Sequence, residues 1–292
     1  PMVKRRDFLI NSGLALGAIA LVPSLAFTTK KKNIGLQLYS LRDTFPANVK
    51  MTLEQIAKTG YNEVETYGFS AKDGFFGTSV KEFKNILSAN GLKSPSGHYD
   101  FSVFMKDGNS DFLKKTIEAA NILGNEYVTV PWLDASVRKT SDDYKKIASK
   151  VNEAAVMCKK SGLKLAYHNH DFEFDALGDT TGYDILLRET DKNLVDFEMD
   201  LYWVVRSGND PLKLFKENPG RFTMWHVKDM DKNDQKLNTE IGNGSIDFKS
   251  IFAEAKLSGM QHFFVEHETN YVPNPMESVK TSFQYVSKNL IS

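Results

Sequence analysis

Residues 142–170 read DDYKKIASKVNEAAVMCKKSGLKLAYHNH and contain one complete structural unit of the chain. Apolar residues return every three or four positions from Asp142 to Lys160, which predicts an amphipathic helix. Gly162 follows, and glycine commonly ends a helix because it accepts a positive φ. The β-rich run Lys164–His168 then predicts a strand that ends in polar side chains. A helix joined to a strand in this way is a unit of an α/β fold.

The same alternation of strand and helix recurs along the chain. Eight strands are predicted, at Ile34–Tyr39, Glu63–Tyr67, Lys93–Tyr99, Tyr127–Pro131, Lys164–His168, Val195–Met199, Phe222–His226 and His262–Glu266. Helices are predicted at Val49–Lys58, Val80–Ala89, Asp111–Leu123, Asp142–Lys160 and Pro275–Lys288. Such alternation implies parallel strands with right-handed crossovers, and eight units close most naturally into a (β/α)₈ TIM barrel. We expect one such domain over residues 27–292.

A doubly wound open sheet is the alternative fold. That fold usually carries a glycine-rich phosphate loop after its first strand. Here Leu38–Asp43 follows the first strand and contains no glycine, while Gly242-Asn243-Gly244 fits a turn better than a dinucleotide loop. The barrel is therefore the preferred prediction.

Composition limits the possible partners. The 292 residues are 41% hydrophobic and 25% charged, with 37 basic and 37 acidic side chains and a net charge of +0. This is typical of a folded soluble protein, and it gives no long-range field to attract nucleic acid. The only cysteine, Cys158, excludes a disulfide framework and a cysteine zinc site within the chain, and we expect it to be a buried apolar residue. Small, weakly charged molecules are the expected partners; the sequence assigns no oligomeric state.

The first 26 residues have the organisation of an export signal. The basic stretch Lys4–Leu9 precedes an apolar run from Gly13 to Val22 and the small-residue end Pro23–Ala26. The paired arginines resemble the twin-arginine signal, which exports folded proteins. The apolar run is too short to span a membrane, so we expect cleavage, a periplasmic location and no stable membrane anchor.

Residues that commonly bind metals end four consecutive predicted strands. Chemistry in a barrel takes place at the C-terminal rim of its strands. His168, Asp200, His226 and Glu266 occupy that rim, one on each strand. Because neighbouring strands lie about 4.8 Å apart, all four side chains can reach one divalent ion. The alternative is that each histidine only bonds the next loop. Glu198 lies on the same side of its strand as Asp200, where it would orient a ligand from behind.

At these positions the chain resembles the xylose-isomerase-like barrels, which include sugar-phosphate isomerases and epimerases, ketose 3-epimerases and inosose dehydratases. The resemblance covers about Ile34 to Leu290. It rests on the segments Gly35–Ser40, Gly60–Glu65, Ser96–His98, Tyr167–His170, Asp200, His226–Asp229, Gly242–Phe248 and Val265–Glu266.

This resemblance implies one divalent cation held by Glu, Asp, His and Glu on the last four strands. Asp200, His226 and Glu266 match the last three ligands, but His168 stands where a glutamate is expected. The imidazole favours Mn²⁺, Co²⁺, Fe²⁺ or Zn²⁺ over Mg²⁺. It also removes one of the two opposed glutamates that epimerases of this kind use as acid and base.

The expected reaction starts with loss of a proton next to a carbonyl group. A divalent ion polarises the carbonyl and stabilises the enediolate, and reprotonation elsewhere gives an isomerase or epimerase. An isomerase or epimerase is the predicted function. The alternative is a lyase or dehydratase of a keto-sugar or keto-glycoside, which the same intermediate gives when the β carbon carries a leaving group. The candidate catalytic residues are Glu266, His170, Glu173 and Lys228. Lys228 would instead neutralise a substrate oxyanion with Asp229 as its partner, unless these two form only a structural ion pair.

Several residues near the rim are expected to bind the substrate. Tyr39, Trp132 and Trp203 would cover the apolar face of a sugar ring, and His98 and Glu65 would contact its hydroxyls. Glu65 has an alternative role in barrel packing, whereas His262 starts a strand at the opposite end and is expected to be structural. Since an exported enzyme rarely meets sugar phosphates, the predicted substrate is an unphosphorylated sugar or keto-sugar.

Two other functions remain possible from the sequence. The first is a carbohydrate-binding barrel without catalysis, which would bind sugar without metal and exchange no proton. A phosphodiester-cleaving repair enzyme of the same superfamily is disfavoured by export, by the neutral charge and by too few histidines for several zinc ions.

Overall fold

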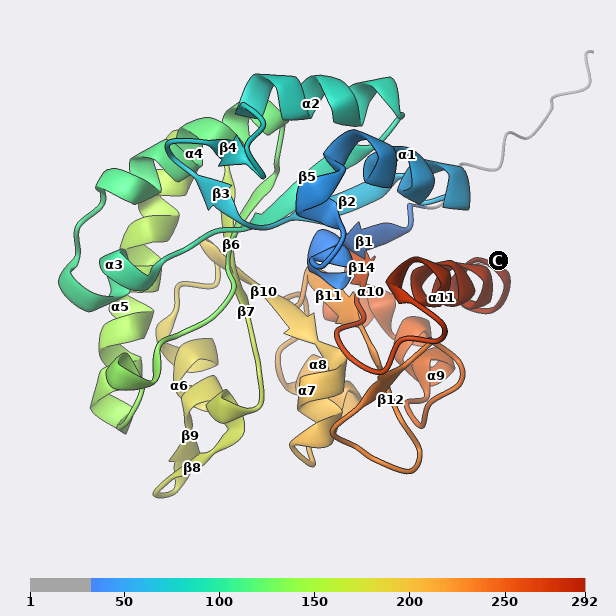
Figure 1. Cartoon of the computed structure of the whole chain (residues 1–292). Helices are drawn as coiled ribbons and strands as arrows, with labels where there is room; N and C mark the ends of the chain where they lie inside the picture. The colour runs from blue at the N-terminus through green and yellow to red at the C-terminus, as the bar shows by residue number, and fades with distance from the viewer. Residues whose placement is uncertain (1–32, 292) are drawn as a thin grey trace, which may run out of the picture. The chain divides into compact units, whose positions relative to one another are not determined.

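The structure, a computed structural model, describes residues 33–291. Eight parallel strands close into a barrel in the order of the chain, with the first strand paired to the last (Figure 1). They are β1 (Gly35–Gln37), β2 (Glu63–Thr66), β5 (Lys93–His98), β6 (Tyr127–Val130), β7 (Lys164–His168), β10 (Val195–Asp200), β11 (Met224–Val227) and β14 (His262–Val265). The predicted TIM barrel is confirmed and the open sheet is wrong. The predicted signal over residues 1–26 lies outside the described residues.

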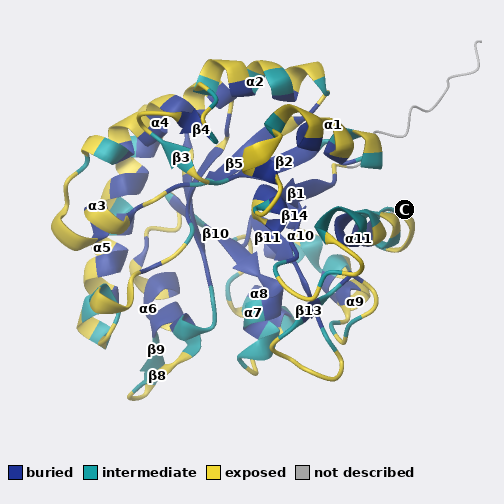
Figure 2. Ribbon diagram, in the orientation of Figure 1, coloured by how far each residue is buried: buried dark blue, intermediate teal, exposed yellow. Residues whose placement is uncertain are grey.

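Helices form the outer layer of the barrel. The longer ones are α1 (Val49–Thr59), α2 (Val80–Ala89), α4 (Asp111–Leu123), α5 (Ser141–Lys160), α6 (Gly182–Glu189) and α11 (Pro275–Asn289). The shorter ones are α3 (Ser102–Asp107), α7 (Leu201–Arg206), α8 (Pro211–Glu217), α9 (Phe248–Ala253) and α10 (Ala255–Ser258). Figure 2 shows their inner faces buried and their outer faces exposed. All five predicted helices are present, with ends within one residue of the prediction.

The first strand is shorter than predicted. It stops at Gln37, and Leu38–Leu41 forms a 3₁₀ helix instead of continuing to Tyr39. The Gln37 side chain accepts a hydrogen bond from the Tyr39 backbone N–H at 3.0 Å, which caps this turn. Tyr39 therefore leaves the sheet and lies over the rim.

The loops at the C-terminal ends of β2, β7 and β11 carry short hairpins. These pair β3 (Phe69–Ser70) with β4 (Gly74–Phe75), β8 (Ala176–Leu177) with β9 (Thr180–Thr181), and β12 (Asp229–Met230) with β13 (Asn238–Thr239). Such loops build the catalytic face of TIM barrels. Among residues 33–291, none of the helices is long and apolar enough to cross a membrane.

The core packs between the strands and the helices. Trp225 on β11 is fully buried and stacks on Phe215 of α8, with ring centroids 5.3 Å apart. Cys158 on α5 is buried, as expected. The sheet register sets Glu198 beside His168 and Asp200 beside His226. Strand pairing thus brings the predicted ligands to one end of the barrel.

Candidate active site

The four predicted metal-ligand side chains meet in the barrel mouth. His168, Asp200, His226 and Glu266 are all buried, and one ligand atom from each lies within 4.8 Å of the others. The Nε2 of His168 is 3.5 Å from Oδ2 of Asp200, and the Nδ1 of His226 is 2.9 Å from Oε2 of Glu266. The convergence expected from the strand ends is therefore present.

The hydrogen bonds of His168 indicate where a cation fits. Its Nδ1 lies 3.1 Å from the carbonyl oxygen of Pro131, and only an N–H can bond there. In the neutral imidazole, Nε2 then carries a lone pair, which faces Oδ2 of Asp200. Neither of these two buried atoms has a hydrogen-bond partner within residues 33–291. The nearest cation to this pair is the ammonium of Lys228, 3.0 Å from Oδ2 of Asp200, and Nε2 of His168 remains available as a ligand. Two nitrogen and two oxygen donors fit a first-row divalent ion.

A second group of polar side chains lies beneath these ligands. The Nε2 of His98 is 2.7 Å from Oε2 of Glu198 and 3.2 Å from Oε2 of Glu65. The Nε2 of His226 is 2.6 Å from the same Glu65 oxygen and 3.3 Å from that of Glu198. Glu65 is fully buried here, so its predicted place at the rim beside a substrate hydroxyl is wrong. Glu198 lies behind the ligand His226, in the supporting position expected for it.

The two buried carboxyl groups differ in their pKa. Burial raises the pKa of Glu65, but the charge of His98 and the hydrogen bond and charge of His226 outweigh this and lower it to about 2. Burial and the charge of Glu65 raise the pKa of Glu198 well above its usual value. Two carboxyl groups that share a site rarely ionise together, so Glu198 holds a proton more readily than Glu65.

Lys228 is fully buried among acidic groups. Its Nζ lies 3.0 Å from Oδ2 of Asp200, 2.8 Å from Oε2 of Glu266 and 3.3 Å from Oε2 of Glu268. Burial lowers the pKa of Lys228, but these carboxylates outweigh it and raise the pKa well above its usual value. The ammonium therefore stays charged beside two of the candidate metal ligands.

Asp229 is not the partner of Lys228, so both predicted forms of that pair are wrong. Adjacent residues of an extended chain point to opposite sides, and Asp229 points away from the barrel mouth. Its carboxylate accepts hydrogen bonds from the backbone N–H groups of Met230 at 2.8 Å, Gly242 at 2.9 Å and Gly244 at 3.1 Å. The Gly242–Gly244 turn, predicted as such, is the loop that Asp229 fixes.

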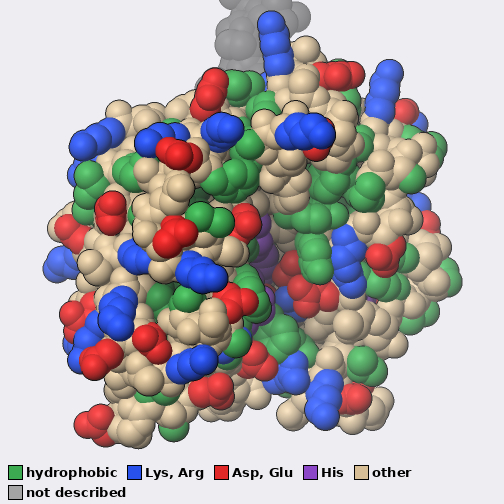
Figure 3. Space-filling view, turned by 60° about the vertical axis from the view of Figure 1, so that its left-hand side comes forward, with side chains coloured by type: hydrophobic (Ala, Val, Ile, Leu, Met, Phe, Trp, Pro, Cys, Tyr) green, Lys and Arg blue, Asp and Glu red, His purple; other side chains and the backbone are tan. Residues whose placement is uncertain are grey.

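A cavity of about 500 Å³ opens above the four ligands. Figure 3 shows a hollow with histidine side chains deep inside it and acidic and hydrophobic side chains around it. Tyr39 and Trp132 line it with 39% and 45% of their surfaces exposed, as expected for residues that pack on a substrate. Its floor includes His98, His168 and Glu266, and none of its lining residues is lysine or arginine. Another hollow, of about 600 Å³, lies between the β3–β4 hairpin and α4, among other residues.

Trp203 and His170 lie beside this cavity. His170 lines it, with its ring stacked on Phe172 at a centroid distance of 5.4 Å. The ring centroids of Trp203 and His170 are 5.7 Å apart, but Trp203 does not line the cavity. Trp203 therefore packs behind the cavity wall, and its predicted place over a bound sugar ring is wrong. The Nδ1 of His170 is buried and has no hydrogen-bond partner in the described part of the chain. Burial and the charge of His168 lower the pKa of His170 well below its usual value, which leaves a lone pair on the ring.

Glu173 lies behind His170, away from the cavity. Its fully buried carboxyl accepts hydrogen bonds from the Tyr167 hydroxyl at 2.7 Å and from the His170 backbone N–H at 2.8 Å. Burial raises the pKa of Glu173 to about 8. This geometry fixes the loop that carries His170, whereas the predicted role as a catalytic base requires contact with substrate.

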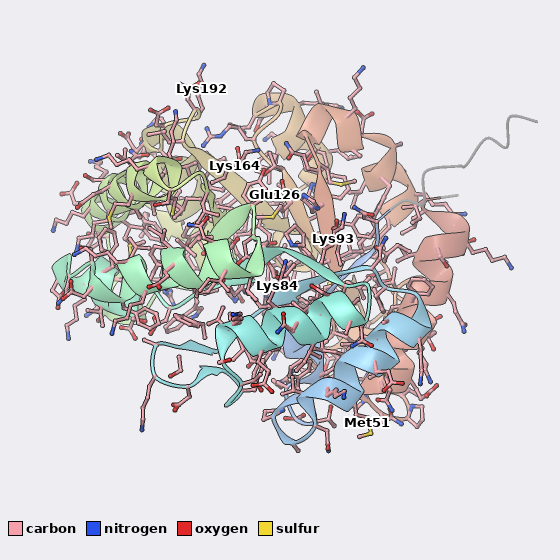
Figure 4. All side chains as sticks on the ribbon, turned by 90° about the horizontal axis from the view of Figure 1, so that it is seen from above. Met51, Lys84, Lys93, Glu126, Lys164 and Lys192 are labelled. Carbon is pink, nitrogen blue, oxygen red and sulfur yellow. The ribbon has the colours of Figure 1, made fainter. Side chains whose placement is uncertain are left out.

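His262 lies at the opposite end of the barrel, as expected. Its Nδ1 is 2.9 Å from Oε2 of Glu63, and its Nε2 is 3.7 Å from Oε2 of Glu126. The labelled side chains of Lys93, Glu126 and Lys164 in Figure 4 belong to the start of β5, the residue before β6 and the start of β7. This second histidine–carboxylate group is separate from the cavity.

Sequence reasoning missed Glu268 as part of the site. It lines the cavity and contacts Lys228, two residues beyond the predicted ligand Glu266. The same spacing of two separates His168 from His170, Glu198 from Asp200 and His226 from Lys228. Alternate residues of a strand share one face, so this spacing was the signal that could have identified it.

Comparison with known proteins agrees with this fold. A family model described as "Xylose isomerase-like TIM barrel" matches residues 53–289. The chain belongs to this family. A crystal structure from Parabacteroides distasonis, described as a sugar phosphate isomerase/epimerase, has a TM-score of 0.80 and 28% identity, and the match covers 91% of this chain and 97% of that one.

Two curated relatives in the family are named inosose dehydratase. The protein from Clostridium perfringens is 28% identical over 176 residues, which is 54% of this chain and 59% of that protein's length. The protein from Geobacillus thermodenitrificans is 25% identical over 257 residues, 73% of this chain and 85% of its own length. The expectation of an enzyme of this superfamily is confirmed, while its reaction belongs to the proposal below.

Proposed function

We propose that this chain is a divalent-metal-dependent enzyme that removes the proton next to the carbonyl of an unphosphorylated keto-sugar and then eliminates a group from the neighbouring carbon. One observation carries the proposal: Nε2 of His168 and Oδ2 of Asp200 lie 3.5 Å apart at the floor of the cavity, and ligand atoms of His226 and Glu266 lie within 4.8 Å of both, an arrangement that suits one divalent ion. His226 and Glu266 complete a four-ligand set at the same point.

The lining of the cavity supports the choice of substrate. Phosphate is normally bound by arginine, lysine or backbone N–H groups at a helix N-terminus. Among residues 33–291 this cavity is lined by the carboxylates of Asp100, Glu266 and Glu268 and by no lysine or arginine, so it lacks the side chains that usually bind a phosphate. Tyr39 and Trp132 offer flat rings to the C–H face of a sugar. A neutral, hydroxyl-rich molecule fits this combination.

The residues of the chain supply the proton transfer. A divalent ion held by the four ligands would polarise the carbonyl and adjacent hydroxyl of a bound keto-sugar. His170 offers the free Nδ1 at the cavity wall and takes the proton from the carbon next to the carbonyl, while the C–H electrons form a C=C bond. The ammonium of Lys228, which is held by Glu266 and Glu268, stabilises negative charge at the cavity floor.

Elimination follows when the β carbon carries a leaving oxygen. The electrons on the former carbonyl oxygen would re-form the C=O bond, the C=C electrons would move to the bond between the α and β carbons, and the bond from the β carbon to the leaving oxygen would break. His170 would return its proton to that oxygen as water or an alcohol is released. One group on one face is sufficient for this sequence, whereas epimerisation needs a second group on the opposite face. His168 in place of the second glutamate supports elimination, and so do the relatives named inosose dehydratase.

The test follows both the proton and the leaving group. Metal-loaded protein is incubated in D₂O with a panel of 3-keto-glucosides and keto-inositols and observed by NMR. We expect deuterium next to the carbonyl together with release of water or the aglycone, loss of both after chelation, and recovery with Mn²⁺ or Co²⁺. His170→Gln should slow the reaction about 10²- to 10⁴-fold at unchanged metal content, with His262→Gln as a control at the other end of the barrel.

Each other outcome identifies a different function. Deuterium incorporation with an isomeric product and nothing released would replace elimination by epimerisation or isomerisation. Sugar binding without any exchange, in protein that contains metal, would favour a carbohydrate-binding barrel.

Export is also part of the proposal, since residues 1–26 support a periplasmic enzyme that meets unphosphorylated sugars. Replacing both Arg5 and Arg6 by lysine should retain the protein in the cytoplasm.

A further inference from the structure

We infer that the barrel binds a second divalent ion directly beneath the first, between the side chains of Glu65, His98, Glu198 and His226. This inference rests on the proposed function for the first ion only. The four groups come from β2, β5, β10 and β11, so they converge across the inside of the barrel rather than from one loop. Seven side chains of metal-ligand type thus meet here, more than one ion requires.

The four ligand atoms form a closed ring. The Oε2 atoms of Glu65 and Glu198 alternate with the Nε2 atoms of His98 and His226, and neighbouring atoms are 2.6, 2.7, 3.2 and 3.3 Å apart. Bonds of about 2.0–2.1 Å in tetrahedral geometry place neighbouring ligand atoms ~3.3 Å apart. Small outward movements of the carboxylates therefore make room for an ion at the centre. Two nitrogen and two oxygen donors suit zinc, manganese or cobalt.

Hydrogen bonds pair the atoms of this ring two by two, His98 with Glu198 and His226 with Glu65. The same Glu65 oxygen also accepts a hydrogen bond from Nε2 of Gln37 at 2.6 Å. Each Nε2 faces two carboxylate oxygens, and one N–H can point well at only one of them. The second oxygen of Glu198, Oε1, is buried and has no partner in the described chain. An ion that binds both carboxylates and both imidazoles resolves these contacts together.

The balance of charge points in the same direction. Glu65, Glu198, Asp200, Glu266 and Glu268 gather in one region, and among residues 33–291 Lys228 is the only lysine or arginine that forms an ion pair with them. A single divalent ion and one ammonium leave these five carboxyl groups short of positive charge. Buried carboxylates are costly without such compensation. A second ion beneath the first would supply this compensation.

The two positions share one ring. The Nδ1 of His226 faces Glu266 in the upper site, and its Nε2 faces Glu65 and Glu198 in the lower one. If both positions were loaded, each nitrogen of His226 would serve one ion and its remaining N–H proton would pass to solvent. His98 retains 11% of its side-chain exposure and lines the cavity, which gives the lower position an entry path.

Metal stoichiometry tests the inference without any substrate. The full chain is stripped with chelator, equilibrated with Mn²⁺, freed of unbound metal and measured by elemental analysis. We expect two equivalents in the wild type, one in Glu198→Gln and His98→Gln, and one in Asp200→Asn, which keeps the lower position. His262→Gln is the matched control, because it alters a buried histidine–glutamate pair at the other end of the barrel and should keep two.

Electron paramagnetic resonance of the same samples tests the distance between the ions. Two Mn²⁺ ions joined by one ring should broaden the six-line spectrum of the wild type, and Glu198→Gln should restore sharp lines. One equivalent in folded wild type, checked by circular dichroism, would overturn the second site and leave the proposed function intact. Two equivalents in the Glu198 and His98 variants, or sharp lines at two equivalents, would also overturn it. Wild type without metal would overturn the proposed function as well.

Discussion

Replacing Glu173 by glutamine tests whether this residue is a base or a support for His170. Its carboxyl is fully buried and accepts hydrogen bonds from the Tyr167 hydroxyl and the His170 backbone N–H. Glutamine has the same shape, and its oxygen can keep the bond from His170 while the Tyr167 hydroxyl turns to accept from the amide. The substitution therefore removes the titration and changes little else.

The size of the effect follows from the pKa. Burial raises the pKa of Glu173 to about 8, against 4.5 for an ordinary glutamate. Between these two values the folded state keeps a proton that the unfolded state loses, so the free energy of unfolding of the wild type falls as pH rises. At about 1.4 kcal/mol per pH unit, the loss is ~3 kcal/mol by pH 7 and at most ~5 kcal/mol above pH 8. Glutamine has no such loss.

Urea unfolding of both proteins at pH values from 5 to 9 measures this difference. We expect Glu173→Gln to match the wild type near pH 5 and to become more stable than it by several kcal/mol at pH 9. Tyr167→Phe keeps the carboxyl and removes a hydrogen bond that lowers its pKa, so its pH dependence should be at least as large as that of the wild type. A difference that stays constant with pH would mean that Glu173 is ionised in the folded protein, and the role as catalytic base would regain support.

Three further substitutions test other contacts. Lys228→Met should tighten Mn²⁺ binding at least about tenfold in calorimetry, because a fixed ammonium a few ångströms from the ion repels it. Lys228→Arg keeps the positive charge and should not tighten binding. An equal or weaker affinity of the methionine variant would contradict this. Burial lowers the pKa of His262, but the hydrogen bond to Glu63 outweighs burial and raises the pKa above its usual value. The contact between His262 and Glu63 therefore stabilises the folded protein at acidic pH, and this stabilisation is lost as the pH rises through the pKa of His262 in the folded state. His262→Gln should thus cost about 1.5–3 kcal/mol at pH 5.5 and less at pH 9 in urea unfolding, and a larger loss at pH 9 would refute the sign. Gly244→Ala should cost about 1–3 kcal/mol, because a Cβ would lie 2.2 Å from Oδ1 of Asp229; an unchanged melting curve would show that the loop moves freely.

The sequence predicted those features that depend on local pattern. Helix α5 begins and ends within one residue of its prediction, because Thr140 and Asp143 form a capping box and Gly162 follows its end with φ +78°. The four metal-ligand positions also followed from the sequence, since each ends a strand and parallel strands of a barrel end at one rim. Local pattern was sufficient for both.

Features that depend on contacts across the barrel could not be predicted in the same way. Glu65 and Glu198 are 133 positions apart, and only the closed barrel brings both to His98 and His226. The pairing of Lys228 with Asp229 failed for a simpler reason. Adjacent residues of a strand face opposite sides, and the spacing of two already favoured Lys228 beside His226 and inside the barrel.

The number of carboxylates in the barrel mouth explains the histidine at position 168, where the family resemblance implies a glutamate. Strands β10 and β14, with the residues just beyond β14, already supply Glu198, Asp200, Glu266 and Glu268 to the barrel mouth, and β2 adds Glu65. A sixth carboxylate beside Asp200 would raise the pKa of its neighbours or require another cation. An imidazole keeps a ligand atom at this position without adding charge, and its bond to the Pro131 carbonyl leaves that atom free to bind. Glu198 places a carboxyl group deeper in the barrel instead, so the donor set moves toward nitrogen at the first ion position and a second ion position becomes possible beneath it.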